Sequence, residues 1–135
     1  MSEIYSNNAI YTRIRAAALA YDSGVFCTQT YAPVPAHFPT VFAREIGRFT
    51  PNNAASFSNT QNIHETTWEV QVHSNLQTGR KEQAYAIMDS VKATMQRLFF
   101  LEVMEQPIDS PAEGYYTLVT RFRRVIGSGE TMPSE

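Results

Sequence analysis

Hydrophobic and polar residues alternate from Thr66 to Leu76, where Trp68, Val70 and Val72 are separated by polar neighbours. A period of two places these three side chains on one face of a β-strand. After a short turn the period changes at Arg80 to that of an amphipathic helix of about five turns. The helix is expected to cover the sheet with an apolar stripe made of Ala84, Ile87, Met88, Val91, Met95, Leu98 and Phe99.

A shorter helix is expected near the N-terminus, capped by Asn7 or Asn8, with an apolar stripe from Ile10 to Tyr21. The elements together predict an α+β fold in the order α-β-β-β-α-β-β. In this fold a mostly antiparallel sheet of about five strands carries the long and the short helix on one face. Besides the strand at Thr66, the expected strands are Val25–Tyr31, Thr40–Phe49, Leu101–Glu105 and Tyr115–Ile126.

Three stretches lack a periodic pattern. Thr50–Glu65 is polar and nearly uncharged around a lone Phe57, and Asn59 lies beside it. A connection of this length is either a contact arm or a mobile loop, and the sequence leaves both open. Pro107–Gly114 is expected to be an acidic turn. Residues 1–127 are therefore predicted to form a single domain, followed by a flexible tail over residues 128–135.

Composition narrows the function classes. The 135 residues carry a formal net charge of −2, whereas general nucleic-acid binders usually have a basic excess. No apolar run approaches the ~20 residues of a membrane-spanning helix, and no secretory signal is recognised, so a cytoplasmic protein is expected. Cys27 is the only cysteine, which excludes an internal disulfide, and a small buried hydrophobe is favoured over a reactive thiol at this position.

Motifs for catalysis, cofactors and metals are missing from the sequence. It contains no phosphate-binding glycine loop, dinucleotide fingerprint or serine nucleophile elbow. His37, His64 and His73 lack the spacing of a helical metal pair, and a solvated strand histidine is favoured at His73. We therefore expect no enzyme activity, no metal and no cofactor.

Charged clusters near the C-terminal strands are candidates for contact. Glu102, Glu105 and Asp109 lie near one turn, where a solvated charged rim is favoured over paired acid–base catalysis. Three arginines, at positions 121, 123 and 124, flank Phe122 in the last strand. Contact with protein is favoured over contact with nucleic acid, because Phe122 is expected to point into the core. The face opposite the helices, with Thr67, Glu69, Gln71, Tyr115 and Thr117, suits solvent or a polar subunit contact.

Four segments together resemble one protein family. In order they are EIYSNNAIYTRIRAAA, FPTVFAREIG, TWEVQVHSNLQTGRKEQAYAIMDSV and YYTLVTRFRRVIG. They are similar to the tail-terminator or tail-completion proteins of long-tailed bacteriophages and prophages, from about Glu3 to Gly127. The strand, turn and helix between Trp68 and Val91 and the closing arginine strand carry most of the likeness. None of these segments is a catalytic motif.

The resemblance implies a structural role in a virion. Proteins of this family form a hexameric ring at the head-proximal end of the tail tube, stop tube polymerisation and join the tail to the head. The implied partners are other copies of the chain, the tail tube protein and the head–tail connector protein. The implied place is the tail or neck of a virion assembled in the host cytoplasm, with no membrane and with nucleic acid at most passing through the ring.

A ring of identical subunits uses different surfaces of each copy in head-to-tail contacts. Opposite charges suit such a contact, so the three arginines of the last strand are expected to meet Glu102, Glu105 and Asp109 of a neighbour. Reversing Arg123 and Arg124 should then weaken assembly without unfolding the subunit. The loop with Phe57 and Asn59 is a second candidate contact.

Two alternative functions remain open from the sequence. One is a neighbouring head–tail connector protein. The other is a small α+β ligand-binding or enzymatic domain with a pocket between the sheet and the long helix. Its lining would be Trp68, Met88, Tyr116 and Phe122, for which a plain core is favoured.

Overall fold

The structure is a computed structural model that describes residues 4–31, 35–49, 63–110, 114–127 and 130–133. Two helices and five strands follow one another in the predicted order, which confirms the α+β fold. Their bounds are α1 Asn7–Tyr21, β1 Phe26–Thr28, β2 Thr40–Phe49, β3 Ile63–Ser74, α2 Arg80–Arg97, β4 Leu101–Ser110 and β5 Tyr115–Gly127.

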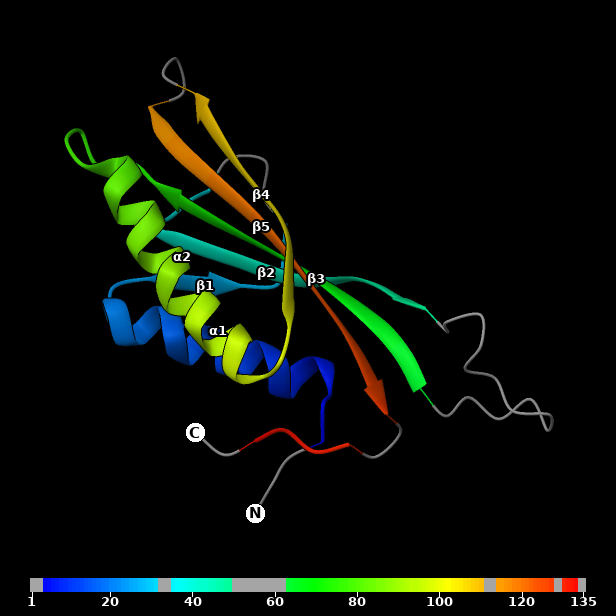
Figure 1. Cartoon of the computed structure of the whole chain (residues 1–135). Helices are drawn as coiled ribbons and strands as arrows, with labels where there is room; N and C mark the ends of the chain where they lie inside the picture. Colours follow the sequence, from blue (N-terminus) through cyan, green and yellow to red (C-terminus); the bar gives the residue numbers. More distant parts are fainter. Residues whose placement is uncertain (1–3, 32–34, 50–62, 111–113, 128–129, 134–135) are drawn as a thin grey trace.

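The five strands form one sheet in the order β1-β2-β3-β5-β4. β1 runs parallel to β2, and the other neighbouring strands are antiparallel. Both helices lie on the same face of the sheet, as predicted, and the described part of the chain places no helix on the opposite face (Figure 1). We call this second surface the open face. β1 and β4 are the two edges of the sheet.

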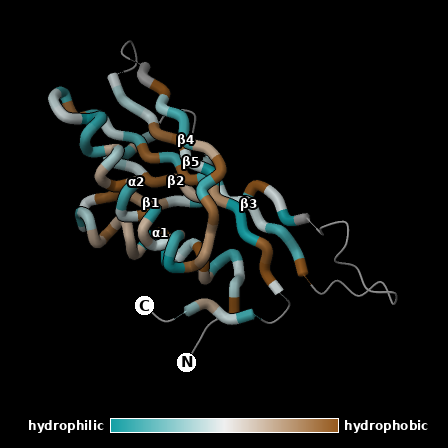
Figure 2. The backbone as a smooth tube through the Cα atoms, in the orientation of Figure 1, coloured by the Kyte–Doolittle hydropathy of each residue, from teal (hydrophilic) through white to brown (hydrophobic). Residues whose placement is uncertain are grey.

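The core lies between the sheet and the two helices, and the central strands contribute alternate residues to it. Trp68 of β3 is opposite Phe122 of β5, and Val72 is opposite Leu118. All four side chains are buried against the helices. Hydrophobic and hydrophilic residues interleave along these strands (Figure 2), so one side of each strand is apolar and packs against the helices. The helices contribute Ile10, Ile14, Ala18, Ala84, Ile87, Met88, Val91 and Met95 to the same core.

The first helix differs from its prediction at both ends. Its N-cap is Ser6, whose hydroxyl accepts a hydrogen bond from the Ala9 backbone amide at 3.1 Å. Asn7 and Asn8 lie inside the helix, so the expected asparagine cap is wrong. Tyr21, expected in the apolar stripe, is exposed because it is the last residue of the helix.

The second helix ends in a left-handed turn at Phe99, which has φ of 65°. The Phe100 amide donates to the Met95 carbonyl and the Phe99 amide to the Gln96 carbonyl, each at 2.9 Å. This is the Schellman pattern of a helix C-terminus. The turn rotates Phe99 out of the apolar stripe, and Phe100 takes the buried position. The prediction of a buried Phe99 is therefore wrong.

The fourth strand is longer than predicted. β4 continues to Ser110, through Pro107, where a turn was expected. Among the described strands, β4 pairs only with β5 and forms an edge of the sheet. Proline lacks a backbone N–H, and such a residue is tolerated in an edge strand because no strand pairs with its outer side. A register shift between Glu102 and Met104 also marks this strand. Bulges and prolines are common at sheet edges.

Residues 130–133 pack against the N-terminal segment instead of fraying. Ile4 and Thr131 form a β-bridge, and the Tyr5 amide donates to the Glu130 carbonyl at 3.3 Å. Met132 is buried in the core at 1% exposure. The two ends of the described chain therefore lie side by side (Figure 1), and the folded domain extends beyond the predicted boundary at residue 127.

Candidate interaction surface

The open face carries the polar residues expected there, but several of them are buried. Glu69, Tyr115 and Thr117 each have less than a tenth of their surface exposed. Part of the cover comes from the segment before β2, where the Phe38 ring centroid lies 5.5 Å from that of Tyr115. The part of the open face around these three residues is therefore a packed polar layer and not a solvated surface.

Glu69 is the centre of this layer. Nε and Nη2 of Arg121 each lie 3.0 Å from Glu69 Oε2. Gln71 Nε2 donates to Glu69 Oε1 at 2.7 Å, and Arg44 Nη2 lies 3.9 Å from the same oxygen. Arg44 and Arg121 come from β2 and β5, the neighbours of β3 on either side. The buried carboxylate thus joins three adjacent strands.

His73 occupies a second buried position of the open face. Its Nδ1 is hydrogen-bonded to the Thr117 hydroxyl at 2.7 Å, and its ring meets Tyr115 edge-on with centroids 5.9 Å apart. The prediction of a solvated His73 is wrong. Burial lowers the pKa of this imidazole to about 4, so His73 is neutral at pH 7.

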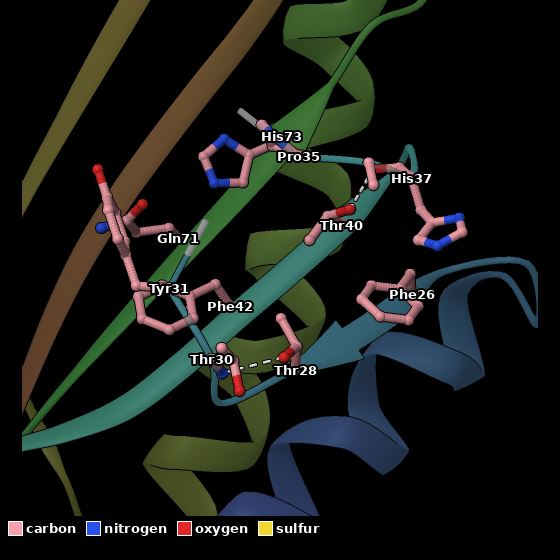
Figure 3. Close-up of a pocket in the computed structure, with 11 residues that line it drawn as sticks. Phe26, Thr28, Thr30, Tyr31, Pro35, His37, Thr40, Phe42, Gln71 and His73 are labelled. Carbon is pink, nitrogen blue, oxygen red and sulfur yellow. Dashed lines mark hydrogen bonds between the residues drawn. The ribbon is translucent and has the colours of Figure 1, made fainter. Parts of the chain in front are cut away.

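A hollow of about 260 Å³ opens on the same face next to the β1 edge. Aromatic rings line it from three elements: Phe26 of β1, Tyr31 of the following connection and Phe42 of β2 (Figure 3). His37 packs on Phe26 with ring centroids 4.6 Å apart. Thr30 contributes part of the polar rim. We call this feature the β1 hollow.

The three arginines of β5 do not form one patch. Arg121 and Arg123 lie on the open face, and Arg121 is already paired with Glu69. Arg123 is exposed and has no ion-pair partner among residues 4–31, 35–49, 63–110, 114–127 and 130–133. Arg124 lies on the opposite side of the strand.

Arg124 is part of the subunit's own packing. Its guanidinium donates to the Leu98 carbonyl at 2.7 Å, to the Tyr5 hydroxyl and to Glu130. It also lies between two aromatic rings, 4.3 Å from the Tyr5 centroid and 5.3 Å from the Phe99 centroid. Reversing this charge is expected to destabilise the subunit, so Arg124 cannot serve as a pure test of assembly.

The predicted acidic partners are also occupied. Lys92 Nζ lies 2.8 Å from Glu105 Oε1 and 3.4 Å from Glu102 Oε1. Burial opposes the charge on Lys92, but the hydrogen bonds and attraction of Glu105 and Glu102 outweigh it and raise the lysine pKa. Asp109 lies opposite Tyr116 in the β4–β5 ladder. Phe57 and Asn59 lie outside the described residues.

Five large hydrophobic residues in β4 or close to it are exposed. Phe99 is 67% exposed and Leu101 is 60% exposed, although both are large hydrophobic residues. Val103, Ile108 and Val125 are also exposed. We call these five residues the β4 strip. Sequence reasoning missed it because Phe99 fits a helical stripe and Ile108 was placed in a turn; the unusual density of apolar residues from position 98 to 108 was the available signal.

Other candidate sites receive no support from the geometry. The residues proposed to line a pocket between sheet and helix, Trp68, Met88, Tyr116 and Phe122, are packed together in the core. Within the described ranges, no three acidic, histidine or cysteine side chains are grouped to hold a metal ion. Among the described helices, none has the length and apolar character needed to cross a membrane.

Comparison with known proteins identifies the fold. No protein-family model matches the chain, and no curated protein matches it. Among solved structures, the chain is similar to a chain in "Virion of native gene transfer agent (GTA) particle". The likeness has a TM-score of 0.58 at 12% sequence identity and covers 84% of this chain and 88% of the other. The fold of this protein is therefore one that also occurs in the virion of a gene transfer agent particle.

Proposed function

We propose that this protein is a structural component of a phage-type virion and acts as a tail terminator. In this role, six copies form a ring on the head-proximal end of the tail tube. The ring stops tube polymerisation and presents the surface that binds the head–tail connector. The protein is then located in the neck of the virion and is not an enzyme.

The likeness to a virion chain is the observation that carries the proposal. It covers most of both chains, so a whole domain is shared and not one supersecondary motif. The sequence resemblance to tail terminators points to the same class of particle. The open face and the β4 strip add surfaces that a single subunit leaves available.

A ligand-binding module is the competing proposal, and the β1 hollow is the observation that favours it. The hollow is concave, mostly aromatic and bordered by polar groups from Thr30 and Gln71. A small-molecule site would make the melting temperature rise with ligand concentration. A structural ring component would show no such dependence on a panel of metabolites.

The mass of the purified protein in solution tests the virion role. Light scattering is measured across a range of concentrations, and negative-stain images are taken of each peak, with and without isolated tail tubes. We expect six subunits around a central hole, either free or on the tube end. A strict monomer that neither assembles nor binds tubes would contradict the proposal.

A further inference from the structure

The β1 hollow and a pair of arginines form one continuous part of the open face. Phe42 lines the hollow, and the Arg44 guanidinium lies 5.4 Å from the centroid of the Phe42 ring. Gln71 also lines the hollow and donates to Glu69 Oε1 at 2.7 Å, and Glu69 pairs with Arg121. The aromatic walls and the two guanidiniums therefore border on each other, and a single ligand can contact both.

The surface beside the hollow carries an excess of positive charge. Glu69 is the carboxylate between Arg44 and Arg121, and its side chain is only 6% exposed. The two arginine side chains are 47% and 46% exposed. One buried carboxylate balances one of the two guanidiniums, and Arg44 Nη2 lies 3.9 Å from it, beyond hydrogen-bond distance. An anionic group beside the hollow is therefore complementary to this surface.

The hollow itself has an uncharged lining. None of its described lining residues is an aspartate, glutamate, lysine or arginine, and the His73 imidazole is neutral at pH 7, since burial lowers its pKa to about 4. Its walls are the rings of Phe26, Tyr31 and Phe42 (Figure 3), with threonine hydroxyls and the Gln71 amide among them. An uncharged ring with a polar edge matches this lining.

The size and the hydrogen-bonding groups of the hollow indicate a heterocycle. Its volume of about 260 Å³ exceeds that of an apolar cavity of about 150 Å³ that binds benzene, so a fused pair of rings fits. The Gln71 amide nitrogen donates to Glu69, and the carbonyl oxygen of the same side chain can accept from a ring N–H or amino group. Nucleobases combine a flat π-face with donor edges of this kind.

We propose that the open face binds single-stranded nucleic acid, with one unpaired base in the β1 hollow and the adjoining phosphate at Arg44. Arg121 lies two strands from Arg44, about 10 Å across the sheet, and binds a second phosphate. Aromatic side chains for the bases beside cations for the backbone are typical of single-strand binding. A base inside a duplex is stacked and paired, so only an unpaired base can enter the hollow. The contact lies within one subunit, and it goes beyond the proposed virion role and does not depend on it.

The formal net charge of −2 restricts this contact to few phosphates. With two phosphates neutralised, the logarithm of the affinity should fall with the logarithm of the salt concentration with a slope of about −1.4. Between about 50 and 200 mM salt, this slope corresponds to about a sevenfold loss of affinity. A general nucleic-acid binder has a much steeper salt dependence, because it neutralises more phosphates.

Two variants of the purified chain test the two halves of the site. Fluorescence anisotropy of a labelled single strand of about ten nucleotides measures the affinity. Arg44→Gln removes the cation and Tyr31→Ala removes an exposed aromatic wall, and each should weaken binding about tenfold or more. The matched controls are Arg48→Gln, which removes the same charge elsewhere on β2, and Tyr21→Ala, at the end of α1. Both controls should keep the wild-type affinity within about twofold, and melting temperatures verify that all four variants are folded.

Changes of the probe test the same contact on the wild-type protein. An abasic strand keeps the phosphates without the bases, and a duplex keeps its bases stacked. Both should bind about tenfold more weakly than the single strand. Equal affinity for the abasic strand or for the duplex would overturn the proposal, since the hollow would then have no part in binding. A mononucleotide that binds as tightly as the strand would also overturn it.

Further outcomes separate this contact from the proposed function and from a protein partner. If the strand binds as described and the wild-type chain forms no rings with or without tail tubes, the contact stands and the virion role is wrong. If rings form and the strand does not bind, the virion role stands and the contact is wrong. Equal losses in Arg44→Gln and Arg48→Gln would reject the contact. An acidic peptide with a central tryptophan that displaces the labelled strand better than unlabelled strand does would assign this surface to a protein partner and reject nucleic acid.

Discussion

Burial of the His73 imidazole makes the stability of the fold depend on pH. Its pKa falls from the usual 6.5 to about 4 in the folded state, because burial disfavours the charged form. Between these values the unfolded chain binds the proton more readily, so the free energy of unfolding decreases as the pH falls. The loss is on the order of 3 kcal/mol between pH 7 and pH 4.

Denaturant unfolding at several pH values measures this loss. In His73→Gln the slope between pH 7 and pH 4 should be smaller than in the wild type. The control His37→Gln makes the same substitution at an exposed histidine. Equal slopes in all three proteins would show that another group controls the acid sensitivity.

Arg121 and Arg123 provide a matched pair on the same face of β5. Arg121 neutralises the buried Glu69, whereas Arg123 has no ion-pair partner among the described residues. Arg121→Ala removes the main partner of the buried Glu69 carboxylate and should lower the free energy of unfolding by about 1–2 kcal/mol. The loss is not larger, because Arg121 is half exposed and solvent screens its attraction to Glu69. Arg123→Ala should change the free energy of unfolding by less than about 0.5 kcal/mol. Urea unfolding measures the free energy of unfolding of both variants. Equal losses in Arg121→Ala and Arg123→Ala would contradict this prediction.

On the open face, the alternation of the sequence predicted the direction of the side chains but not their burial. Alternation correctly predicted that His73 and Glu69 point away from the helices. It did not reveal their burial, because the cover comes from residues distant in sequence, such as Phe38, and from cross-strand arginines. The side of the sheet on which a residue lies follows from the periodicity of the strand. Whether that residue is buried depends on what packs over it.

Among the elements, long periodic segments were predicted well and segment ends were not. α2 and β5 have strong patterns, and their buried faces agree with the prediction. β4 was cut short at Pro107, since its position at the sheet edge is a tertiary property. The β1 hollow was not predicted, because its lining combines β1, β2, β3 and the connection after β1.

The segment over residues 130–133 is predicted to stabilise the domain. Met132 is 1% exposed, so Met132→Ala removes a buried side chain and should lower the free energy of unfolding by about 2–4 kcal/mol. Thr131→Ala, an exposed neighbour, should have an effect below about 0.5 kcal/mol. Guanidinium unfolding compares the two. A Met132→Ala protein as stable as the wild type would restore the prediction of a flexible tail after residue 127.

For the whole molecule, the proposed ring predicts electrostatic control of assembly. Arg123→Glu reverses an exposed cation that has no ion-pair partner among the described residues, and it should weaken assembly without changing the melting temperature. Added salt should weaken assembly of the wild type and affect the variant less. Light scattering at low and high ionic strength measures both effects. Unchanged assembly in Arg123→Glu would place this arginine outside the contact between copies.

The bridge between Ile4 and Thr131 has a consequence for the timing of folding. Tyr5 directly precedes Ser6, the N-cap of the first helix, yet the Tyr5 backbone amide and the neighbouring bridge depend on Glu130 and Thr131. Residues 130–133 leave the ribosome only after every strand of the sheet has been made. A nascent chain therefore lacks the contacts of residues 130–133 with the segment before its N-terminal helix until translation has passed β5. The subunit therefore completes its fold only after the whole sheet has been synthesised.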